Sequence, residues 1–310
     1  MKNQLTFETR KVFTKRSLKR DLPLYMMLLV PVVLLFIYKY IPMFGLLISF
    51  KKYLPAKGFN GSRWVGMKNF VTLFSMSNFK SAMANTVTIA LWKIVLHILV
   101  PVIFTIMLNE IKQQRLKKLY QTLIYLPHFI SWVMLAGIFN KLLSGDGIVN
   151  QLLSHFGVNR IIFLGDNKWF KFTLIFTDIW KEFGYGTIVY LAAVAGVNTE
   201  LYEAAEVDGA GHWQQMLHVT LPCLTPTIVM MSALSLGNIL NAGFDQVYNM
   251  YNSMVMQSGD ILDTLVYRIA FSNGDFGLST AAGLFKSLIS LILTALSYRL
   301  AYVTTGYQVF

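Results

Sequence analysis

The 310-residue sequence has few charged residues and a single cysteine. Charged residues make up 14% of the chain and hydrophobic residues 55%, with a mean hydropathy of +0.52. Soluble domains average about 25% charged residues, so this chain has too few charges to cover its apolar surface in water. The lone Cys223 excludes an intramolecular disulfide framework and a zinc ribbon, and 14% aromatic residues exclude intrinsic disorder. We therefore expect a membrane protein.

The sequence also lacks the motifs by which many proteins bind nucleotides or metals. It has no G-x-x-x-x-G-K-[ST] loop, and its five histidines are scattered without an H-E-x-x-H motif. We expect no catalytic residue, metal site or cofactor on this chain, because no clustered nucleophile and base of an intramembrane enzyme is present. The apolar segments also lack the repeated ionisable residues of proton-driven pumps. Energy for any transport is therefore expected to come from a partner.

Basic residues outnumber acidic residues by 27 to 15, which gives a net charge of +12. Seven basic residues lie in the first 20 positions, namely Lys2, Arg10, Lys11, Lys15, Arg16, Lys19 and Arg20. Because this cluster directly precedes an apolar run, it indicates a cytoplasmic tail that contacts membrane lipid. No nucleic-acid-binding motif accompanies the charge, so nucleic acid is not an expected partner.

Six segments are long and apolar enough to cross a bilayer, which takes about 20 residues. They are 22–50, 81–108, 119–143, 169–194, 222–244 and 280–303. The first segment is too long for a signal-peptide core, and no small-residue cleavage site ends it. We therefore expect a retained signal-anchor helix at the N-terminal end of the membrane domain.

The basic residues are unequally distributed between the two sets of loops. With the N-terminus inside, the inner segments hold 11 Lys or Arg over 58 positions and the outer segments 9 over 90. This difference favours a cytoplasmic N-terminus, and six spans return the C-terminus to the same side. The sequence predicts an all-α membrane protein with a basic tail at 1–21, a membrane domain at 22–303 and a cytoplasmic tail at 304–310.

The inner segment at about 198–222 is acidic and contains no Lys or Arg. Asn198 is suited to cap a helix over 199–208, and Gly209 is suited to end it. A second amphipathic turn follows, and Pro222 stands where a new helix is expected to begin. An acidic cytoplasmic loop is expected to face a basic protein surface and not lipid phosphate.

Within this segment, E-A-A is followed by three residues, a glycine, nine residues and V-x-L-P. The residues concerned are Glu203, Ala204, Ala205, Asp208, Gly209, Ala210, Val219, Leu221 and Pro222. This pattern resembles the EAA loop of binding-protein-dependent ABC importer permeases, in which Ile stands at the position of Val219. Segments 64–70, 180–191, 244–248 and 263–268 resemble the carbohydrate-type members of that family, which import oligosaccharides, often from polysaccharide breakdown.

The resemblance implies a six-transmembrane-helix type I ABC importer permease fold. It implies an assembly with a second, different permease chain, two cytoplasmic ATPase subunits that bind ATP and magnesium, and an extracytoplasmic substrate-binding protein or lipoprotein. In such an importer the E-A-A helix docks on the ATPase, Glu203 and Asp208 pair with basic ATPase residues, and Gly209 makes the turn. The chain is then expected in the cytoplasmic membrane of a bacterium, where it forms half of the translocation path by alternating access.

Ionisable and aromatic residues in the later spans are candidates for the substrate path. They are Asp178, Trp180, Lys181, Glu182, Tyr185, Phe244, Asp245 and Tyr248. Charged residues within a membrane are costly and usually face the bundle interior or a water cavity, and Trp and Tyr rings suit the apolar faces of sugars. An internal ion pair between Asp178 and Lys181, three residues apart, is the alternative role for those two side chains.

Two other functions stay open on the sequence. One is a permease of the same superfamily for another solute, such as a peptide, phosphate or a metal chelate. The other is a stand-alone membrane scaffold, which gives no reason for the E-A-A spacing. Aromatic residues and the D-T-x-x-Y-R sequence at 263–268 favour the sugar permease.

Overall fold

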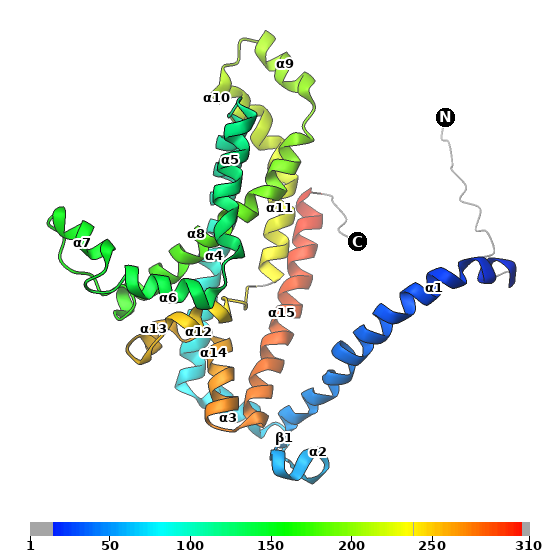
Figure 1. The fold of residues 1–310 in the computed structure, drawn as a ribbon. Helices are drawn as coiled ribbons and strands as arrows, with labels where there is room; N and C mark the ends of the chain where they lie inside the picture. Colours follow the sequence, from blue (N-terminus) through cyan, green and yellow to red (C-terminus); the bar gives the residue numbers. More distant parts are fainter. Residues whose placement is uncertain (1–14, 238, 306–310) are drawn as a thin grey trace.

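The computed structural model describes residues 15–237 and 239–305, which are mostly helical (Figure 1). The predicted tail residues 1–14 and 306–310 lie outside the described residues. The long helices are α1 (Lys15–Leu35), α4 (Ser77–Asn109), α8 (Asn167–Ala195), α11 (Leu221–Gly237) and α15 (Phe276–Thr305). Shorter helices are α2 (Gly58–Gly61), α3 (Lys68–Ser75), α5 (Gln114–Tyr125), α6 (Trp132–Leu142), α7 (Ile148–His155), α9 (Thr199–Val207), α10 (His212–Gln215), α12 (Phe244–Met250), α13 (Met256–Gly259) and α14 (Leu262–Tyr267).

Tighter and wider helical turns join these helices. The 3₁₀ segments are η2 (Ile41–Phe50), η3 (Pro55–Lys57), η4 (Leu126–Phe129) and η6 (Ser253–Val255), and the π segments are η1 (Phe36–Tyr40), η5 (Met216–Thr220) and η7 (Arg268–Ser272). The all-α fold class is confirmed, and one small element departs from it. Strands β1 (Lys51–Lys52) and β2 (Arg63–Trp64) form an antiparallel pair in the loop after the first helix.

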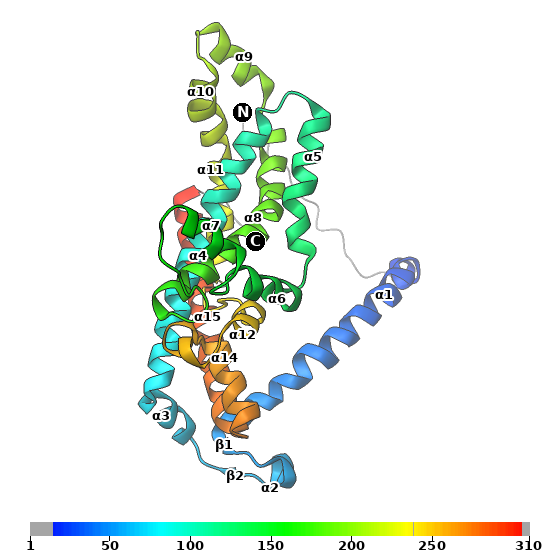
Figure 2. The ribbon, with the colours of Figure 1, turned by 60° about the vertical axis from the view of Figure 1, so that its left-hand side comes forward.

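The long helices α4, α8, α11 and α15 run side by side, with α4 packed on α8 and α11 packed on α15 (Figures 1 and 2). Helices α9 and α10 lie at one end of this bundle. Helices α2 and α3 and the β-strands lie at the opposite end. The two ends thus carry the two kinds of loop that the predicted topology places on opposite sides of the membrane.

The buried core lies where the short helices α12–α14 pack among α4, α8 and α15. Its largest cluster joins Ile89 of α4, Phe170 and Leu174 of α8, and Val247 and Met250 of α12. Each of these side chains is at most 2% exposed. Because these apolar side chains are almost fully buried, their packing fixes the positions of α8 and α12, which carry the predicted path residues.

In the first apolar helical segment, Asp21–Phe50, the part that belongs to α1 stands apart from the bundle in both views, whereas its last part, η2, packs on α15. The whole segment is 30 residues long with a mean hydropathy of 2.1, and no residue in its most apolar stretch is buried. At 1.5 Å per residue the α-helical part, 21–35, is about 22 Å long, and the ten 3₁₀ residues of η2 add about 20 Å at about 2.0 Å each, so the segment is long enough to cross the roughly 30 Å hydrocarbon core of a bilayer. Its surface therefore needs lipid or another chain as its neighbour.

Four described helical segments are long and apolar enough to cross a membrane, and a fifth is counted if one bent pair forms a single span. The four are Asp21–Phe50, Ser77–Asn109, His212–Gly237 and Phe276–Arg299. Helix α8 is 29 residues long, but five charged side chains lower its hydropathy. The count of six spans therefore stays a prediction.

Two predicted spans differ from the observed helices. The segment 119–143 is not one straight helix, because Gln114–Phe129 and Trp132–Leu142 meet at 99°. Pro127 and the extended residues Ile130 and Ser131 interrupt the helical hydrogen bonds there. Helix α11 ends at Gly237 and not at 244. Gly243, at φ +92°, adopts a left-handed conformation just before α12.

Candidate functional site

The E-A-A segment begins with a capped helix, as predicted. The Asn198 side-chain oxygen accepts a hydrogen bond from the backbone N–H of Glu200 at 3.1 Å. The helix then runs over Thr199–Val207, one residue shorter than the predicted 199–208. Capping satisfies a backbone N–H that has no partner within the helix, so the start of α9 is fixed by this local bond.

The helix ends at Gly209 in a paired set of backbone hydrogen bonds. The Gly209 N–H donates to the Glu206 carbonyl at 3.0 Å, and the Ala210 N–H donates to the Ala205 carbonyl at 2.8 Å. These two bonds form a Schellman motif, which requires a left-handed residue after the last helical position. Gly209 meets this requirement with φ +80°. The turn thus depends on glycine at this position.

The helical rod after the turn does not begin at Pro222. Helices α10 and α11 join through η5 into one segment from His212 to Gly237, so that prediction is wrong. The π turn at Met216–Thr220 lies directly before the proline. A π turn widens the helix locally, which accommodates a residue that cannot donate a backbone hydrogen bond. Leu221 is half-buried and Pro222 is exposed.

The acidic segment presents both apolar and charged side chains to the surroundings. Val207 is 88% exposed and Trp213 is 76% exposed. Glu203, Ala204 and Asp208 are also exposed, whereas Ala205 and Ala210 are half-buried. This segment therefore carries both large apolar side chains and carboxylates on its exposed surface.

A shallow groove of about 240 Å³ runs along this surface. It is lined by Ala205, Asp208, Gly209, Ala210, Gln214, His218 and Val219. The Tyr202 and Thr220 hydroxyls lie 2.9 Å apart and join α9 to η5. The loop is therefore held as a unit on the ends of the long helices.

Asp178 does not pair with Lys181. Its Oδ1 lies 3.1 Å from the Lys93 Nζ of α4, and its Oδ2 lies 2.8 Å from the His97 Nε2. Lys93 also donates to the Ala242 carbonyl at 2.8 Å and to the Gln246 Oε1 at 2.6 Å. This network joins α4 and α8 to the turn before α12. Lys93 and His97 were not predicted as site residues, although their spacing of four positions places both on one face of α4.

The Asp178 network lines a polar cavity of about 230 Å³. The cavity lies between α4, α8 and the segment that links α11 to α12. Its lining residues are Ala90, Lys93, Ile94, His97, Asp178, Ser235, Asn241, Ala242 and Gly243. A polar cavity inside a bundle of apolar helices is the environment expected for a solute path.

Lys181 and Glu182 form a second cluster at the bend between α5 and α6. Lys181 Nζ donates to Glu182 Oε1 at 2.6 Å and to the His128 carbonyl at 2.8 Å. His128 Nδ1 lies 2.6 Å from Glu182 Oε2, and its ring stacks on Tyr185 at a centroid distance of 4.0 Å. These contacts fix the bend on α8. The predicted path residues Lys181, Glu182 and Tyr185 therefore have partners within the protein. His128, which joins them, was not predicted from the sequence.

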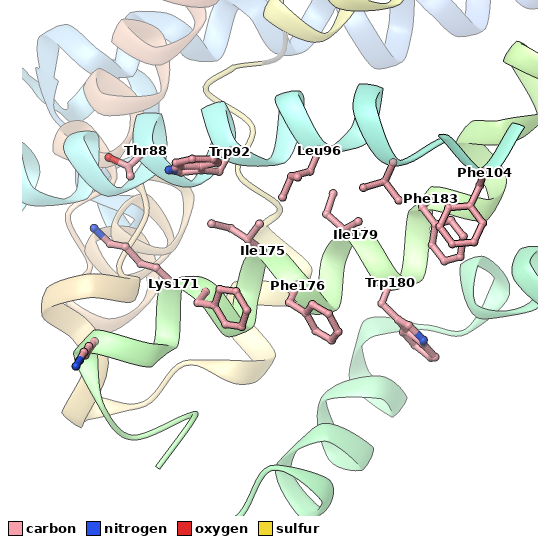
Figure 3. Close-up of a pocket in the computed structure, with 13 residues that line it drawn as sticks. Thr88, Trp92, Leu96, Phe104, Lys171, Ile175, Phe176, Ile179, Trp180 and Phe183 are labelled. Carbon is pink, nitrogen blue, oxygen red and sulfur yellow. The ribbon is translucent and has the colours of Figure 1, made fainter. Parts of the chain in front are cut away.

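Trp180 lies away from the polar cavity. It is 40% exposed and lines an apolar groove between α4 and α8 (Figure 3). Its position two residues after Asp178 places it on the far side of the helix, because each residue turns an α-helix by about 100°. The structure therefore divides the residues predicted at 178–185 among three different surroundings.

Phe244 and Tyr248 form an aromatic cluster with Tyr267 of α14. Phe244 stacks on Tyr248 at 5.2 Å, and the Tyr267 ring lies 4.9 Å from Tyr248 and 5.7 Å from Phe244. Tyr248 is 39% exposed, and Asp245 is exposed beside it. The D-T-x-x-Y-R sequence contributes Tyr267, so the two segments that resemble carbohydrate permeases meet in space.

Two ion pairs lie near the aromatic cluster, one between the residues that flank α14 and one between α14 and α15. Arg268 Nη2 lies 2.5 Å from Asp260 Oδ2, and Lys286 Nζ of α15 lies 2.5 Å from Asp263 Oδ1. Each pair offers polar atoms near exposed rings. Over residues 15–237 and 239–305, no group of three or more His, Cys, Asp or Glu side chains is placed to hold a metal ion.

The chain belongs to the family of binding-protein-dependent transport system inner membrane components, which matches residues 97–303. Members of that family are multi-pass membrane permeases, and the long apolar helices of this chain agree with such a fold. The matched range includes the E-A-A segment, the aromatic cluster and the lining of the polar cavity from His97 onward, whereas Lys93 precedes it.

Among similar proteins, the polygalacturonan/rhamnogalacturonan transport system permease protein YteP of Bacillus subtilis is 41% identical over 90% of this chain and 87% of its own length. A chain in the crystal structure of a bacterial ABC transporter involved in the import of the acidic polysaccharide alginate superposes with a TM-score of 0.87. It is 36% identical and covers 94% of this chain and 98% of its own. A chain in a complex of a bacterial alginate ABC transporter with an alginate pentasaccharide-bound periplasmic protein superposes equally well, with a TM-score of 0.87, 36% identity and coverage of 95% and 99%.

Proposed function

We propose that this chain is one permease subunit of an ATP-driven importer of oligosaccharides in the cytoplasmic membrane of a bacterium. The observation that carries the proposal is the capped helix, glycine turn and continuing helix at 198–222, which keeps the E-A-A spacing. Family membership supports transport. The carbohydrate class is supported by the names of YteP and of the alginate transporter.

The E-A-A loop is the proposed contact with a cytoplasmic ATPase, and the proposed assembly holds two such subunits, which bind ATP and magnesium. The exposed Glu203 and Asp208 carboxylates suit basic residues of an ATPase, and the exposed Val207 and Trp213 suit an apolar groove. The small Ala204 and Ala205 allow the partner backbone to approach closely. This combination of apolar anchors and charges is typical of protein interfaces.

The loop is well placed to transmit motion. Helix α9 follows α8 after a three-residue link, and α10 continues through η5 into α11 without a break. A movement of the docked loop therefore acts on α8 and α11, and both contribute residues to the polar cavity. We propose that ATP binding moves these helices between inward- and outward-facing arrangements, as a two-state equilibrium biased by the ATPase.

The proposed path follows the polar cavity at Asp178 and the aromatic cluster of Phe244, Tyr248 and Tyr267. Sugar rings have an apolar face that packs on aromatic side chains and hydroxyls that hydrogen-bond to carboxylates and amides. The exposed Tyr248 ring and the Asp245 carboxylate offer both kinds of group within one helix. Trp180 and Tyr185 do not share this site, so we omit them from the proposed path.

Two further partners complete the proposed assembly. The unburied surface of Asp21–Phe50 suits lipid and a second permease chain, because a membrane protein folds its apolar helices against one or the other. A substrate-binding protein is proposed on the outer face. The alginate transporter, at 36% identity, is in complex with a periplasmic protein that carries the sugar.

Copurification from native membranes tests this proposal. The chain is tagged, extracted in mild detergent, and its partners are identified by mass spectrometry. We expect one ATPase, a second permease and a substrate-binding protein, which can then be screened against peptides, phosphate, chelates and glycans. Recovery of the intact chain alone in repeated preparations would support a stand-alone scaffold. A binding protein that binds none of the glycans would support transport of another solute.

A further inference from the structure

An apolar groove of about 700 Å³ runs between α4 and α8 on the outside of the polar network (Figure 3). Its walls include Trp92 and Phe104 of α4 and Phe176 and Phe183 of α8, and two lysines, Lys168 and Lys171, lie at one end. The volume falls within the range of about 300–1,000 Å³ that is usual for ligand pockets. The groove therefore offers a long apolar channel below a cationic rim.

Lys168 and Lys171 are arranged to bind an anion. They lie three residues apart at the start of α8, so they share one face of the helix, at the end where the helix dipole is positive. Neither ammonium group forms an ion pair or side-chain hydrogen bond with any residue in the described part of the chain. The nearby Asp166 carboxylate instead accepts the Lys168 backbone N–H at 2.9 Å.

The length of the groove fits one acyl chain below a headgroup. From Thr88 to Phe104 it follows sixteen residues of α4, or about 24 Å at 1.5 Å per residue. Half of the hydrocarbon core of a bilayer is about 15 Å thick, so the groove spans one leaflet with room for a headgroup at its rim. Figure 3 shows Lys171 at the end of the row of aromatic side chains, beside Thr88.

We propose that this groove binds an anionic phospholipid. Lys168 and Lys171 hold the phosphate, and an acyl chain lies between α4 and α8 against Trp92, Phe176 and Phe183. The site reaches the helix pair whose inner contact is the ion pair of Lys93 with Asp178, so the bound lipid supports the packing of α4 on α8. The inference depends on the chain lying in a membrane and is independent of the solute that it transports.

Charge favours a lipid over a helix of a second permease in this groove. A phospholipid brings a phosphate to the two lysines. The alternative occupant is a helix of a second permease that resembles this chain's own Asp21–Phe50 segment. In that segment the sole carboxylate, Asp21, is the first residue, so such a helix brings no anion into the apolar groove. The lysines then gain no anionic partner in the groove and extend to interfacial water, whereas a phosphate supplies that partner.

The native tryptophans of the groove provide the test. The assembled importer is placed in nanodiscs that contain phosphatidylglycerol or phosphatidylcholine with brominated acyl chains, which quench tryptophan fluorescence on contact. We expect brominated phosphatidylglycerol to quench more strongly at equal mole fraction. The Lys168→Gln/Lys171→Gln variant should lose this preference by about tenfold or more, as expected for two lysines near a lipid surface. The Trp92→Phe/Trp180→Phe variant should remove the preferential quenching.

A matched variant, Lys80→Gln/Lys141→Gln, removes two exposed lysines that do not line the groove, and it should keep the preference. Equal quenching by both lipids in the unmodified importer would overturn the proposal. So would an unchanged preference in the Lys168→Gln/Lys171→Gln variant, or cross-linking of an Ile175→Cys variant to the second permease. Copurification of the partners in each sample checks the assembly, so loss of the lipid site is distinguishable from loss of the importer.

Discussion

The Asp178 carboxylate of α8 lies 3.1 Å from the Lys93 ammonium of α4, and the two side chains are 11% and 8% exposed. This buried pair joins helices whose contributing residues are 85 positions apart. The same carboxylate contacts His97 at 2.8 Å and faces the polar cavity. The pair therefore connects the packing of the bundle with the proposed path of the solute.

Breaking this pair is expected to destabilise the chain strongly. Replacing Lys93 by Met leaves the Asp178 carboxylate buried without its ammonium partner, a change that costs about 3–5 kcal/mol in buried ion pairs. The Lys93→Met/Asp178→Leu double variant should recover most of the loss. Thermal unfolding of the detergent-solubilised complex measures both effects. Arg160→Met, which breaks an ion pair with 60% and 88% exposed side chains, should change stability by at most about 1 kcal/mol.

Removing the α9 cap should loosen the E-A-A helix without unfolding the protein. Asn198→Ala deletes the acceptor of the Glu200 N–H, which costs about 1 kcal/mol. Hydrogen exchange of the α9 amides should accelerate by about fivefold, the equivalent of that free energy. Asn198→Asp keeps an acceptor and should exchange like the unmodified chain. Equal exchange in all three proteins would show that the cap does not hold the helix.

A bulky residue at Gly209 is expected to abolish transport while the chain still reaches the membrane. Gly209→Val forces a β-branched residue into φ +80°, so the turn that orients α9 changes. Gly157→Val is the matched control, because Gly157 has φ +73° and, like Gly209, no heavy atom within 4 Å of an added Cβ. Uptake of labelled oligosaccharide should be lost in the first variant and kept in the second. Loss in both would indicate general backbone strain.

The Tyr248 ring is expected to contribute to sugar affinity. Tyr248→Ala removes an exposed aromatic face that lies 4.9 Å from Tyr267, and aromatic contacts contribute about 0.5–1.5 kcal/mol. The substrate concentration for half-maximal uptake should therefore rise by about threefold to tenfold. Tyr248→Phe keeps the ring and should stay close to the unmodified value. Phe156→Ala removes an 83% exposed ring elsewhere and should have no effect.

The sequence predicted local structure well where the determining contacts are near in the chain. The cap at Asn198 and the turn at Gly209 each depend on residues within five positions, so their chemistry is visible in the sequence. The start at Pro222 was missed because a π turn before a proline has no comparable sequence signal.

Tertiary pairings were not predictable in the same way. The i, i+3 spacing suggested that Asp178 pairs with Lys181, but the stronger constraint is that each charge finds a partner on a packed neighbouring helix. Lys93 and His97 supply it for Asp178, and His128 supplies it for Glu182. The 99° bend beside His128 decides which side chains meet, and a hydropathy pattern does not encode that angle.

Uptake by the reconstituted complex tests the central claim most directly. The copurified chains are placed in proteoliposomes with ATP and magnesium on the side of the E-A-A loop and the binding protein with labelled oligosaccharides of polygalacturonan or alginate on the other side. The account predicts accumulation that requires ATP, magnesium and the binding protein, and that is lost in Gly209→Val. Accumulation without ATP, or ATP hydrolysis by the intact complex without accumulation of any oligosaccharide, would contradict it.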